Sequence, residues 1–212
     1  FLLTPEYATQ LAFVAIDGPD GSEQRAREIA DHPFGAPTFT GKSWPLADVR
    51  SLAPILPSKV LCLGRNFRDH AAELGNPVPT SPILFMKPST SVIGPNAAIK
   101  LPANSARVDY EGELAVVIGR MCKDVEPEDA LKVVFGYTCA NDVTARDLQK
   151  SDGQWSRAKG FDTFCPLGPW IETDLDPMDQ PLVTRLDGEI VQDGHTSDMV
   201  HGVTELISHA SK

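Results

Sequence analysis

Short hydrophobic runs, most of them ended by glycine or proline, divide the chain into segments of strand length. Residues 109–119 are the clearest example, because the half from Leu114 to Ile118 is apolar and rich in β-branched residues, and Gly119 ends it. Residues 181–191 predict a β-hairpin, since apolar and polar positions alternate on both sides of a central Asp-Gly turn. Further strands are predicted over residues 11–16, 59–64, 83–86 and 133–139.

Helices are predicted in fewer and shorter stretches. Residues 66–74 form a helix candidate because Gly75 lies where a helix C-cap belongs. Residues 126–134 predict another helix, with Pro127 in its first turn and Asp124 available as its cap. Two more helices are expected over residues 144–150 and 204–209. The pattern as a whole predicts a strand-rich α+β fold with few, short helices.

The beginning of the chain differs in pattern from the rest. Residues 1–57 are heterogeneous and end in a segment marked by Pro54 and Pro57. We interpret them as a small N-terminal domain, followed by a larger domain over residues 58–212. A chain of 212 residues, 42% of them hydrophobic, is long enough for one substantial core with a small appended domain.

Composition narrows the partners and the location of the protein. The formal net charge of −10 argues against nucleic acid and anionic membranes, which basic patches bind. The apolar runs are too short to span a bilayer, and the N-terminus has no basic start typical of a signal peptide. No two of the four cysteines form a Cys-x-x-Cys pair, so we expect free thiols in a reducing, cytoplasmic location.

The segment Asp109-Tyr110-Glu111-Gly112-Glu113 carries the first chemical signal. Residues two apart in a strand point to the same side, so Glu111 and Glu113 project together, with Gly112 leaving open space between them. Two neighbouring carboxylates at the edge of an apolar strand repel each other unless a cation lies between them. A hard divalent cation with oxygen ligands is the simplest candidate.

A third acidic residue, Asp142, follows an apolar strand, where its side chain is able to face the mouth of a sheet. By itself it is better explained as the cap of a helix that starts at Val143 or Thr144. Beside the two glutamates, the metal-ligand interpretation gains support. Three carboxylates, with water or substrate completing an octahedron, suit Mg²⁺ or Mn²⁺.

Other segments offer a base and positive charge. On a helix, His70 and Glu73 share a face, and a carboxylate orients an imidazole that acts as a general base. Lys87 follows an apolar strand and Lys159 opens a loop, so either could bind a carboxylate substrate or stabilise an enolate. The alternatives are an exposed His–Glu pair and solvated surface lysines.

Together these segments resemble the fumarylacetoacetate hydrolase family, in its bacterial branch of catechol-degradation and acylpyruvase-like enzymes. The resemblance runs in unbroken order over about residues 58–209. It is carried by Gly64-Arg65-Asn66-Phe67 with His70 and Glu73, Phe85-Met86-Lys87-Pro88, Asp109-Tyr110-Glu111-Gly112-Glu113, Gly136-Tyr137, Asn141-Asp142-Val143-Thr144-Ala145-Arg146-Asp147 and Lys159-Gly160-Phe161-Asp162. Phe67 stands where tyrosine is common in this family.

The resemblance implies a rolled, mixed β-sheet, a homodimer and one Mg²⁺ or Mn²⁺ per subunit. By motif position, the metal ligands are Glu111, Glu113 and Asp142, and the catalytic residues are His70, Glu73 and Lys159. Substrate contacts are expected from Arg65, Lys87, Thr144 and Gln149. The family's closing Pro-Gly-Asp and Thr-Gly-Thr-Pro segments do not occur, so we expect the C-terminal end of the domain to be incomplete.

The implied function is metal-dependent chemistry on a small 2-keto or 2-hydroxydienoate acid through a metal-bound enolate. The resemblance favours a 2-hydroxyhepta-2,4-diene-1,7-dioate isomerase or an acylpyruvate hydrolase of the fumarylpyruvate type in aromatic catabolism. Oxaloacetate decarboxylation is the enzymatic alternative, because it passes through the same kind of enolate. A non-catalytic metal-binding protein of the same fold is the alternative from another class.

Overall fold

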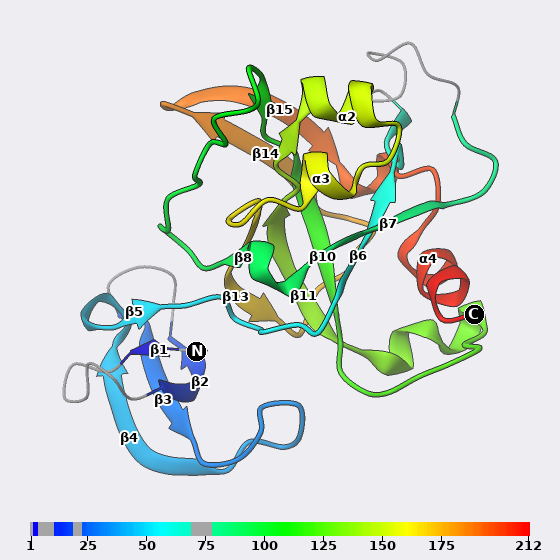
Figure 1. The fold of residues 1–212 in the computed structure, drawn as a ribbon. Helices are drawn as coiled ribbons and strands as arrows, with labels where there is room; N and C mark the ends of the chain where they lie inside the picture. Colours follow the sequence, from blue (N-terminus) through cyan, green and yellow to red (C-terminus); the bar gives the residue numbers. More distant parts are fainter. Residues whose placement is uncertain (1, 4–10, 19–22, 69–77) are drawn as a thin grey trace.

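A computed structural model describes residues 2–3, 11–18, 23–68 and 78–212. The chain forms the predicted strand-rich α+β fold with mixed sheets, and the N-terminal strands form a sheet of their own (Figure 1). In the described ranges, no helix has the length and apolar character needed to cross a bilayer.

The N-terminal sheet is antiparallel, with the strand order β4-β3-β2-β1-β5. Its strands are β1 (Leu2–Leu3), β2 (Leu11–Asp17), β3 (Arg25–Ile29), β4 (Phe39–Pro45) and β5 (Arg50–Ser51), with the 3-10 helix η1 (Leu46–Asp48) before β5. Ala26 and Ile29 of β3 are both buried although they lie three residues apart, and the register with β4 shifts between Arg27 and Ile29.

The larger part is built on a four-stranded sheet with the order β10-β11-β13-β8. These strands are β8 (Val92–Ile93), β10 (Gly112–Ile118), β11 (Val134–Asn141) and β13 (Cys165–Glu172). The pairs β10–β11 and β11–β13 are antiparallel, whereas β13 and β8 run parallel, so the sheet is mixed.

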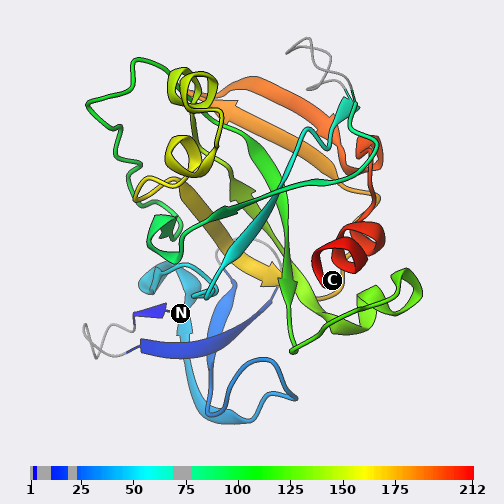
Figure 2. The same cartoon turned by 45° about the vertical axis from the view of Figure 1, so that its right-hand side comes forward.

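Two-stranded ladders and short helices surround this sheet (Figure 2). The ladders pair β6 (Val60–Gly64) with β7 (Ile83–Lys87), β9 (Val108–Asp109) with β12 (Thr144–Ala145), and β14 (Pro181–Leu186) with β15 (Glu189–His195). The helices are η2 (Ser89–Ser91), η3 (Pro127–Val133), α2 (Arg146–Asp152), α3 (Ser156–Lys159), η4 (Thr196–Asp198) and α4 (Val203–Ala210).

Most of the predicted elements are confirmed, but residues 109–119 do not form one strand. Asp109 pairs with Thr144 in one ladder, whereas Gly112 pairs with Asn141 in another. The chain crosses from the first ladder to the second at Tyr110 and Glu111. The hairpin over residues 181–191 is confirmed, with β14 and β15 antiparallel and Asp187-Gly188 at the turn.

The predicted helix over residues 126–134 is a 3-10 helix, and Asp124 does not cap it. Pro127, Ala130 and Val133 are three residues apart, and a 3-10 helix places such positions on one face. Ala130 and Val133 are buried there, which explains the tighter winding. Asp124 has a left-handed backbone with φ of 50°, and Glu126 occupies the N-cap position instead.

The helix predicted over residues 144–150 begins later than expected. Thr144 and Ala145 belong to β12, and α2 starts at Arg146. These two residues pair with β9 instead of joining the helix, with Thr144 opposite Asp109 and Ala145 opposite Val108. The helix over residues 204–209 is confirmed as α4, whereas most of the helix over residues 66–74 lies outside the described residues.

Two hydrophobic clusters hold the larger part together. One brings η3, β11 and α4 together and includes Val133, Tyr137 and Ile207. The other is formed by Val143, Ala145 and Phe164. Because the second cluster lies next in the chain to Asp142 and Thr144, its packing holds the segment that carries the candidate site.

Replacing Phe164 by alanine tests this second cluster. Phe164 is fully buried, so we expect Phe164→Ala to lower the free energy of unfolding by about 3–5 kcal/mol through lost burial and a cavity. Urea denaturation measures the change. Leu101→Ala is the control, because Leu101 is 70% exposed and its loss should change stability by less than about 0.5 kcal/mol. Equal effects of the two substitutions would contradict this assignment of the core.

Candidate active site

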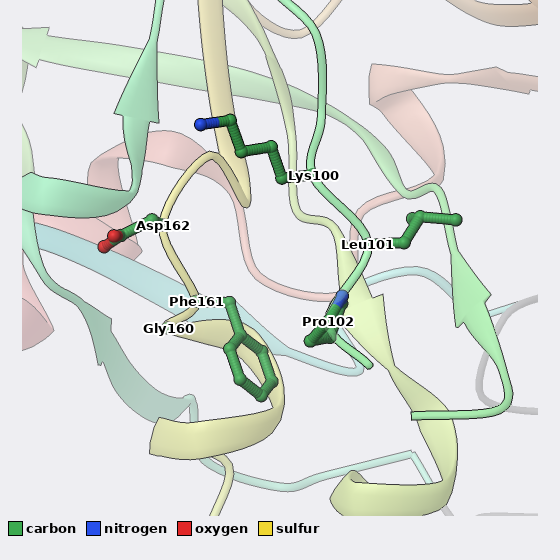
Figure 3. Close-up of a pocket in the computed structure, with 6 residues that line it drawn as sticks. All are labelled: Lys100, Leu101, Pro102, Gly160, Phe161 and Asp162. Atoms are coloured by element: carbon green, nitrogen blue, oxygen red, sulfur yellow. The ribbon is translucent and has the colours of Figure 1, made fainter. Parts of the chain in front are cut away.

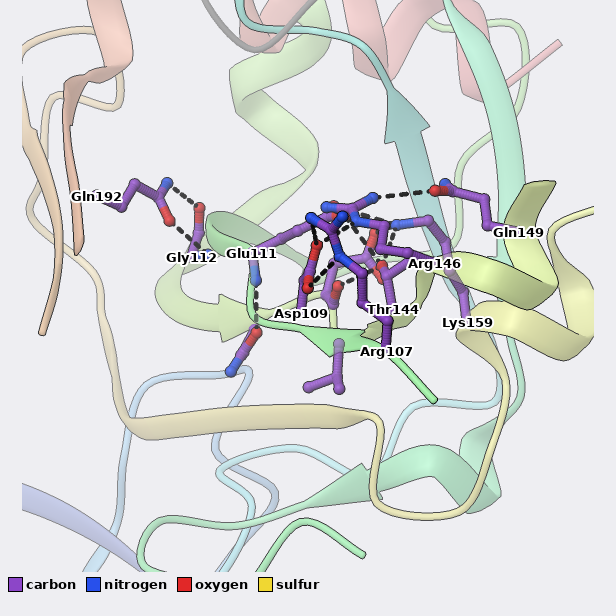
Figure 4. Close-up of polar contacts among 12 residues, drawn as sticks. Arg107, Asp109, Glu111, Gly112, Thr144, Arg146, Gln149, Lys159 and Gln192 are labelled. Carbon is purple, nitrogen blue, oxygen red and sulfur yellow. Dashed lines mark hydrogen bonds and ion pairs between the residues drawn. The ribbon is translucent and has the colours of Figure 1, made fainter. Parts of the chain in front are cut away.

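The candidate site is formed where the link between β9 and β10, the end of β11 and the end of α3 meet (Figure 4). The β10–β11 register pairs Gly112 with Asn141, which places Glu111 beside Asp142. The Asp142 N–H donates to the Glu111 carbonyl at 2.8 Å, and the Glu111 N–H donates to Asn141 Oδ1 at 2.9 Å. Strand register therefore brings together two of the three predicted metal ligands.

Asp142 lies between two buried lysines. Its Oδ1 accepts from Lys87 Nζ and its Oδ2 accepts from Lys159 Nζ, both at 2.5 Å. Lys87 also donates to the Val143 carbonyl at 3.2 Å. All three charged side chains are buried, and buried charges are tolerated only when they are paired and hydrogen-bonded.

Lys159 also binds Glu111 and Thr144. Its Nζ lies 3.1 Å from Glu111 Oε2 and 2.7 Å from Thr144 Oγ1. The same Nζ lies 5.0 Å from the centre of the Phe85 ring, within the range of a cation–π interaction. Thr144 Oγ1 lies 3.0 Å from Glu111 Oε1, so the hydroxyl bridges the lysine and the glutamate.

Arg146 is a second cation on Glu111, a role that its place in the sequence motif did not reveal. Arg146 Nη2 lies 2.5 Å from Glu111 Oε1, and its Nε donates to Asp109 Oδ2 at 2.9 Å. Burial opposes the charge on Asp109, but hydrogen bonds from Arg107 and Arg146 outweigh it and hold the Asp109 pKa below its usual value. Gln149 reaches this network through Arg146 Nη1, from which it accepts at 3.0 Å.

Glu113 is the carboxyl group of the site that lacks a close partner. Burial raises its pKa to about 8, and the negative charges of Glu111 and Asp142 add to this effect while Lys159 acts against it. In the described part of the chain, no group donates a hydrogen bond to the Glu113 carboxylate. A cation bound beside the Glu113 carboxyl would favour its charged form.

The donor set fits a hard divalent cation in its chemistry. Glu111, Glu113 and Asp142 supply oxygen ligands, and among the described residues Glu113 forms no ion pair, whereas Lys87, Lys159 and Arg146 pair with the other two carboxylates. Among the described residues, no three acidic, histidine or cysteine side chains are already spaced around a metal position. The Lys159 ammonium lies between Glu111 and Asp142, so a cation there would take over part of its contacts.

The remaining predicted site residues do not join the charged cluster in the described part of the chain. Arg65 is half-buried directly after β6, with a left-handed backbone (φ 58°) and no contact with the cluster among the described residues. His70 and Glu73 lie outside the described residues. Asp142 is not a helix cap, because β12 follows it and Ala145 occupies the N-cap position of α2.

Two cysteines near the site are not suited to act as nucleophiles. Burial raises the pKa of the Cys165 thiol to about 11, with Lys87 acting against the rise and Asp142 adding to it. Burial also raises the pKa of the half-buried Cys62. Both thiols therefore stay protonated near neutral pH, and the four cysteines are free, as predicted.

A pocket of about 390 Å³ opens one residue after Lys159 (Figure 3). Two segments line it, residues 100–102 and residues 160–162. Lys159 is not among the lining residues, so the pocket neighbours the charged cluster along the chain without containing it.

The chain matches two known protein-family models over most of its length. The family model described as "Fumarylacetoacetate (FAA) hydrolase C-terminal" matches residues 59–212. The chain belongs to the fumarylacetoacetate hydrolase family. A second model, "Rv2993c-like, N-terminal", matches residues 7–54. The protein Rv2993c of Mycobacterium tuberculosis is 58% identical over 206 residues, which cover 95% of this chain and 78% of that protein.

Solved structures of similar proteins share the fold. A structure called 2-hydroxyhepta-2,4-diene-1,7-dioate isomerase, from Mycobacterium marinum, has a TM-score of 0.91 at 52% identity and covers 99% of this chain and 79% of its own. A structure called 5-carboxymethyl-2-hydroxymuconate delta-isomerase, from Mycobacterium smegmatis, has a TM-score of 0.90 at 53% identity, with 99% and 80% coverage.

More distant relatives of this family member carry other activities in their names. The human mitochondrial oxaloacetate tautomerase FAHD2A is 44% identical over 174 residues, or 79% of this chain and 55% of that protein. A 2,4-didehydro-3-deoxy-L-rhamnonate hydrolase of Sphingomonas is 45% identical over 158 residues, or 73% and 55%. The chain thus spans about half the length of these two relatives, and the family contains isomerases, tautomerases and hydrolases.

The buried Lys87 gives a test of the charged cluster. Lys87→Met removes one of the two cations on Asp142, so we expect the free energy of unfolding to fall by about 3 kcal/mol in buffer with EDTA. Urea denaturation measures this loss. The double variant Lys87→Met/Asp142→Asn should recover about 1 kcal/mol, because it removes the partly unpaired charge.

The control for Lys87→Met is Lys132→Met. Lys132 also pairs with an aspartate at 2.5 Å, but on the exposed surface, and its loss should leave the denaturation midpoint unchanged. If Lys87→Met were as stable as the wild type, the ion pair with Asp142 would not hold these elements together.

Proposed function

We propose that the protein is a divalent-metal-dependent enzyme that acts on a 2-keto or 2-hydroxydienoate carboxylic acid. In this proposal Glu111, Glu113 and Asp142 hold Mg²⁺ or Mn²⁺. The observation that carries it is the meeting of the Glu111 and Asp142 carboxylates at Lys159, with Glu113 two residues further along the chain and without a hydrogen-bond partner among the described residues. The names of the relatives support the substrate class, because isomerisation of a hydroxydienoate and tautomerisation of oxaloacetate both move a proton next to a 2-oxo group.

The bound cation would supply Lewis acidity toward the neighbouring carboxylate and 2-oxo oxygens of the substrate. Lys159 places an ammonium group beside these ligands, where it is able to balance negative charge that develops on the substrate. Lys87 and Arg146 act further out, since they bind Asp142 and Glu111 and thereby orient the ligand oxygens. Thr144 orients the Lys159 ammonium through its hydroxyl.

The proton-transfer step is assigned to His70 with Glu73, on the strength of the family motif. A carboxylate beside the imidazole orients the ring and favours its protonated form, which suits a base that takes a proton from carbon or from water. The non-catalytic alternative leaves this pair without a role, so the enzyme is the better-supported proposal.

Within this class we favour isomerisation or hydrolysis of a dicarboxylic aromatic-breakdown intermediate, such as 2-hydroxyhepta-2,4-diene-1,7-dioate. The name of the structure from M. marinum supports this choice. Oxaloacetate tautomerisation is the second candidate, supported by the name of the human relative, and decarboxylation of oxaloacetate remains the alternative from the sequence. A homodimer also stays a prediction, which light scattering during gel filtration would test.

The first test is an absorbance assay with the purified chain. We expect turnover of the heptadienedioate, of an acylpyruvate or of oxaloacetate that depends on Mg²⁺ or Mn²⁺ and disappears with EDTA. Metal-independent turnover would contradict the metal proposal. Metal binding without turnover of any of these acids would support the non-catalytic alternative.

Glu113→Ala tests the metal ligands directly. We expect the dissociation constant for Mn²⁺, measured by isothermal titration calorimetry, to rise by more than about 100-fold. Residues that only support a metal ligand change the affinity by about 10–100-fold, and this substitution removes a ligand itself. Glu128→Ala is the matched control, since Glu128 is exposed on η3 and should leave the affinity unchanged. Full Mn²⁺ affinity in Glu113→Ala would exclude Glu113 as a ligand.

His70→Ala tests the assigned base. We expect kcat to fall by about 10²–10⁴-fold, the usual contribution of a positioned general base, while Mn²⁺ affinity stays at the wild-type value. Steady-state kinetics at saturating Mn²⁺ gives the measurement, and His32→Ala in the N-terminal part is the control. Unchanged turnover in His70→Ala would show that another residue acts as the base.

A further inference from the structure

We infer that Gln192, held in place by Thr184, is a positioning residue for the Glu111-Gly112-Glu113 segment. Its side-chain amide takes the place of a neighbouring strand at Gly112, and in this way it sets the relative placement of the two glutamates. The inference rests on the metal site of the proposed function, which it deepens.

The Gln192 carboxamide binds both backbone groups of Gly112 (Figure 4). The Gly112 N–H donates to Gln192 Oε1 at 2.9 Å, and Gln192 Nε2 donates to the Gly112 carbonyl at 2.8 Å. β10 lies at an edge of its sheet, with β11 on its other side. A carboxamide carries one acceptor and one donor group in a plane, so it matches the pair of groups that an edge strand presents.

Thr184 fixes the orientation of this carboxamide. Thr184 and Gln192 lie directly opposite each other in the β14–β15 hairpin, so their side chains share a face. The Thr184 hydroxyl donates to Gln192 Oε1 at 3.0 Å. The oxygen thus receives two hydrogen bonds, and the amide nitrogen is left facing the Gly112 carbonyl.

Glycine is required at position 112 because the side chains of Thr184 and Gln192 lie so close to its backbone. A Cβ atom at this position would collide with Thr184 Oγ1 and would press against Gln192 Oε1. The sequence suggested that Gly112 leaves open space between two glutamates, but the structure shows that the hairpin uses the space on its Cβ side. The absent side chain allows the hairpin to reach the backbone.

The four backbone groups of Glu111 and Gly112 are therefore all bonded. Asn141 and Asp142 bind the two groups of Glu111 from the β11 side, and Gln192 binds the two groups of Gly112 from the hairpin side. Loss of Gln192 would leave the N–H and carbonyl groups of Gly112, which lies between the two glutamates, without these hydrogen bonds. Since Gln192 touches neither carboxylate, we expect its loss to weaken metal binding without removing a ligand.

Isothermal titration calorimetry of the full chain with Mn²⁺ tests the inference. We expect Gln192→Leu to raise the dissociation constant by about 10–100-fold, the range for residues that support a metal ligand. Thr184→Val, which keeps the side-chain shape but lacks the hydroxyl, should raise it less. Thr184→Ser keeps the hydroxyl and should bind Mn²⁺ like the wild type.

Two further measurements separate positioning from a general loss of structure. Amide hydrogen exchange should become faster in the peptide that contains Gly112 in Gln192→Leu, and the melting temperature of Thr184→Val should stay near that of the wild type. At saturating Mn²⁺, kcat and KM of Gln192→Leu should return to within about threefold of the wild-type values.

The outcomes distinguish the inference from the proposed function. Wild-type Mn²⁺ affinity in Gln192→Leu would overturn the inference alone, as would equal losses of affinity in Thr184→Ser and Thr184→Val. If the wild-type chain bound no Mn²⁺, the metal site itself would be wrong and the inference would fall with it.

Discussion

The structure of the larger part depends on one buried carboxylate with two buried lysines. Asp142 comes from the end of β11, Lys87 from the end of β7 and Lys159 from the end of α3, so a single side chain ties three separate elements together. Burying these charges is costly, and the cost is offset only while all three remain in contact. Gly160 ends α3, and a Cβ there would collide with the Ser156 carbonyl of the same helix and press against Pro88, which follows Lys87 in the chain.

Around this centre, the site combines hydrogen-bonded backbone with one carboxyl group, Glu113, that forms no ion pair among the described residues. Glu111 is bound by Arg146 and Lys159, whereas Glu113 has a raised pKa and no hydrogen-bond donor among the described residues. A carboxyl group left without a partner in this way is typical of a functional site, since a purely structural network would pair each charged group. It explains why we place the metal, and not the substrate alone, at this point of the fold.

The relatives share this fold but differ in the reactions that their names describe. In our proposal, the carboxylates and Lys159 of this chain suit each of these reactions, because each needs negative charge stabilised near a 2-oxo group. Selectivity must then come from residues that meet the far end of the substrate. The predicted contacts Lys87 and Gln149 are bound to Asp142 and Arg146 here, which suits a supporting role.

The sequence by itself determined the features that depend on neighbours along the chain. The hairpin over residues 181–191 and helix α4 follow from local alternation and turn residues, and the family resemblance follows from the motifs themselves. The tertiary structure alone decided that Lys87 is buried in an ion pair with Asp142 and that Gln192 binds Gly112, 80 residues away. It also decided that η3 winds as a 3-10 helix to bury Ala130 and Val133. Such contacts depend on strand register and on how elements pack. The local sequence therefore does not show which distant group will complete a hydrogen bond.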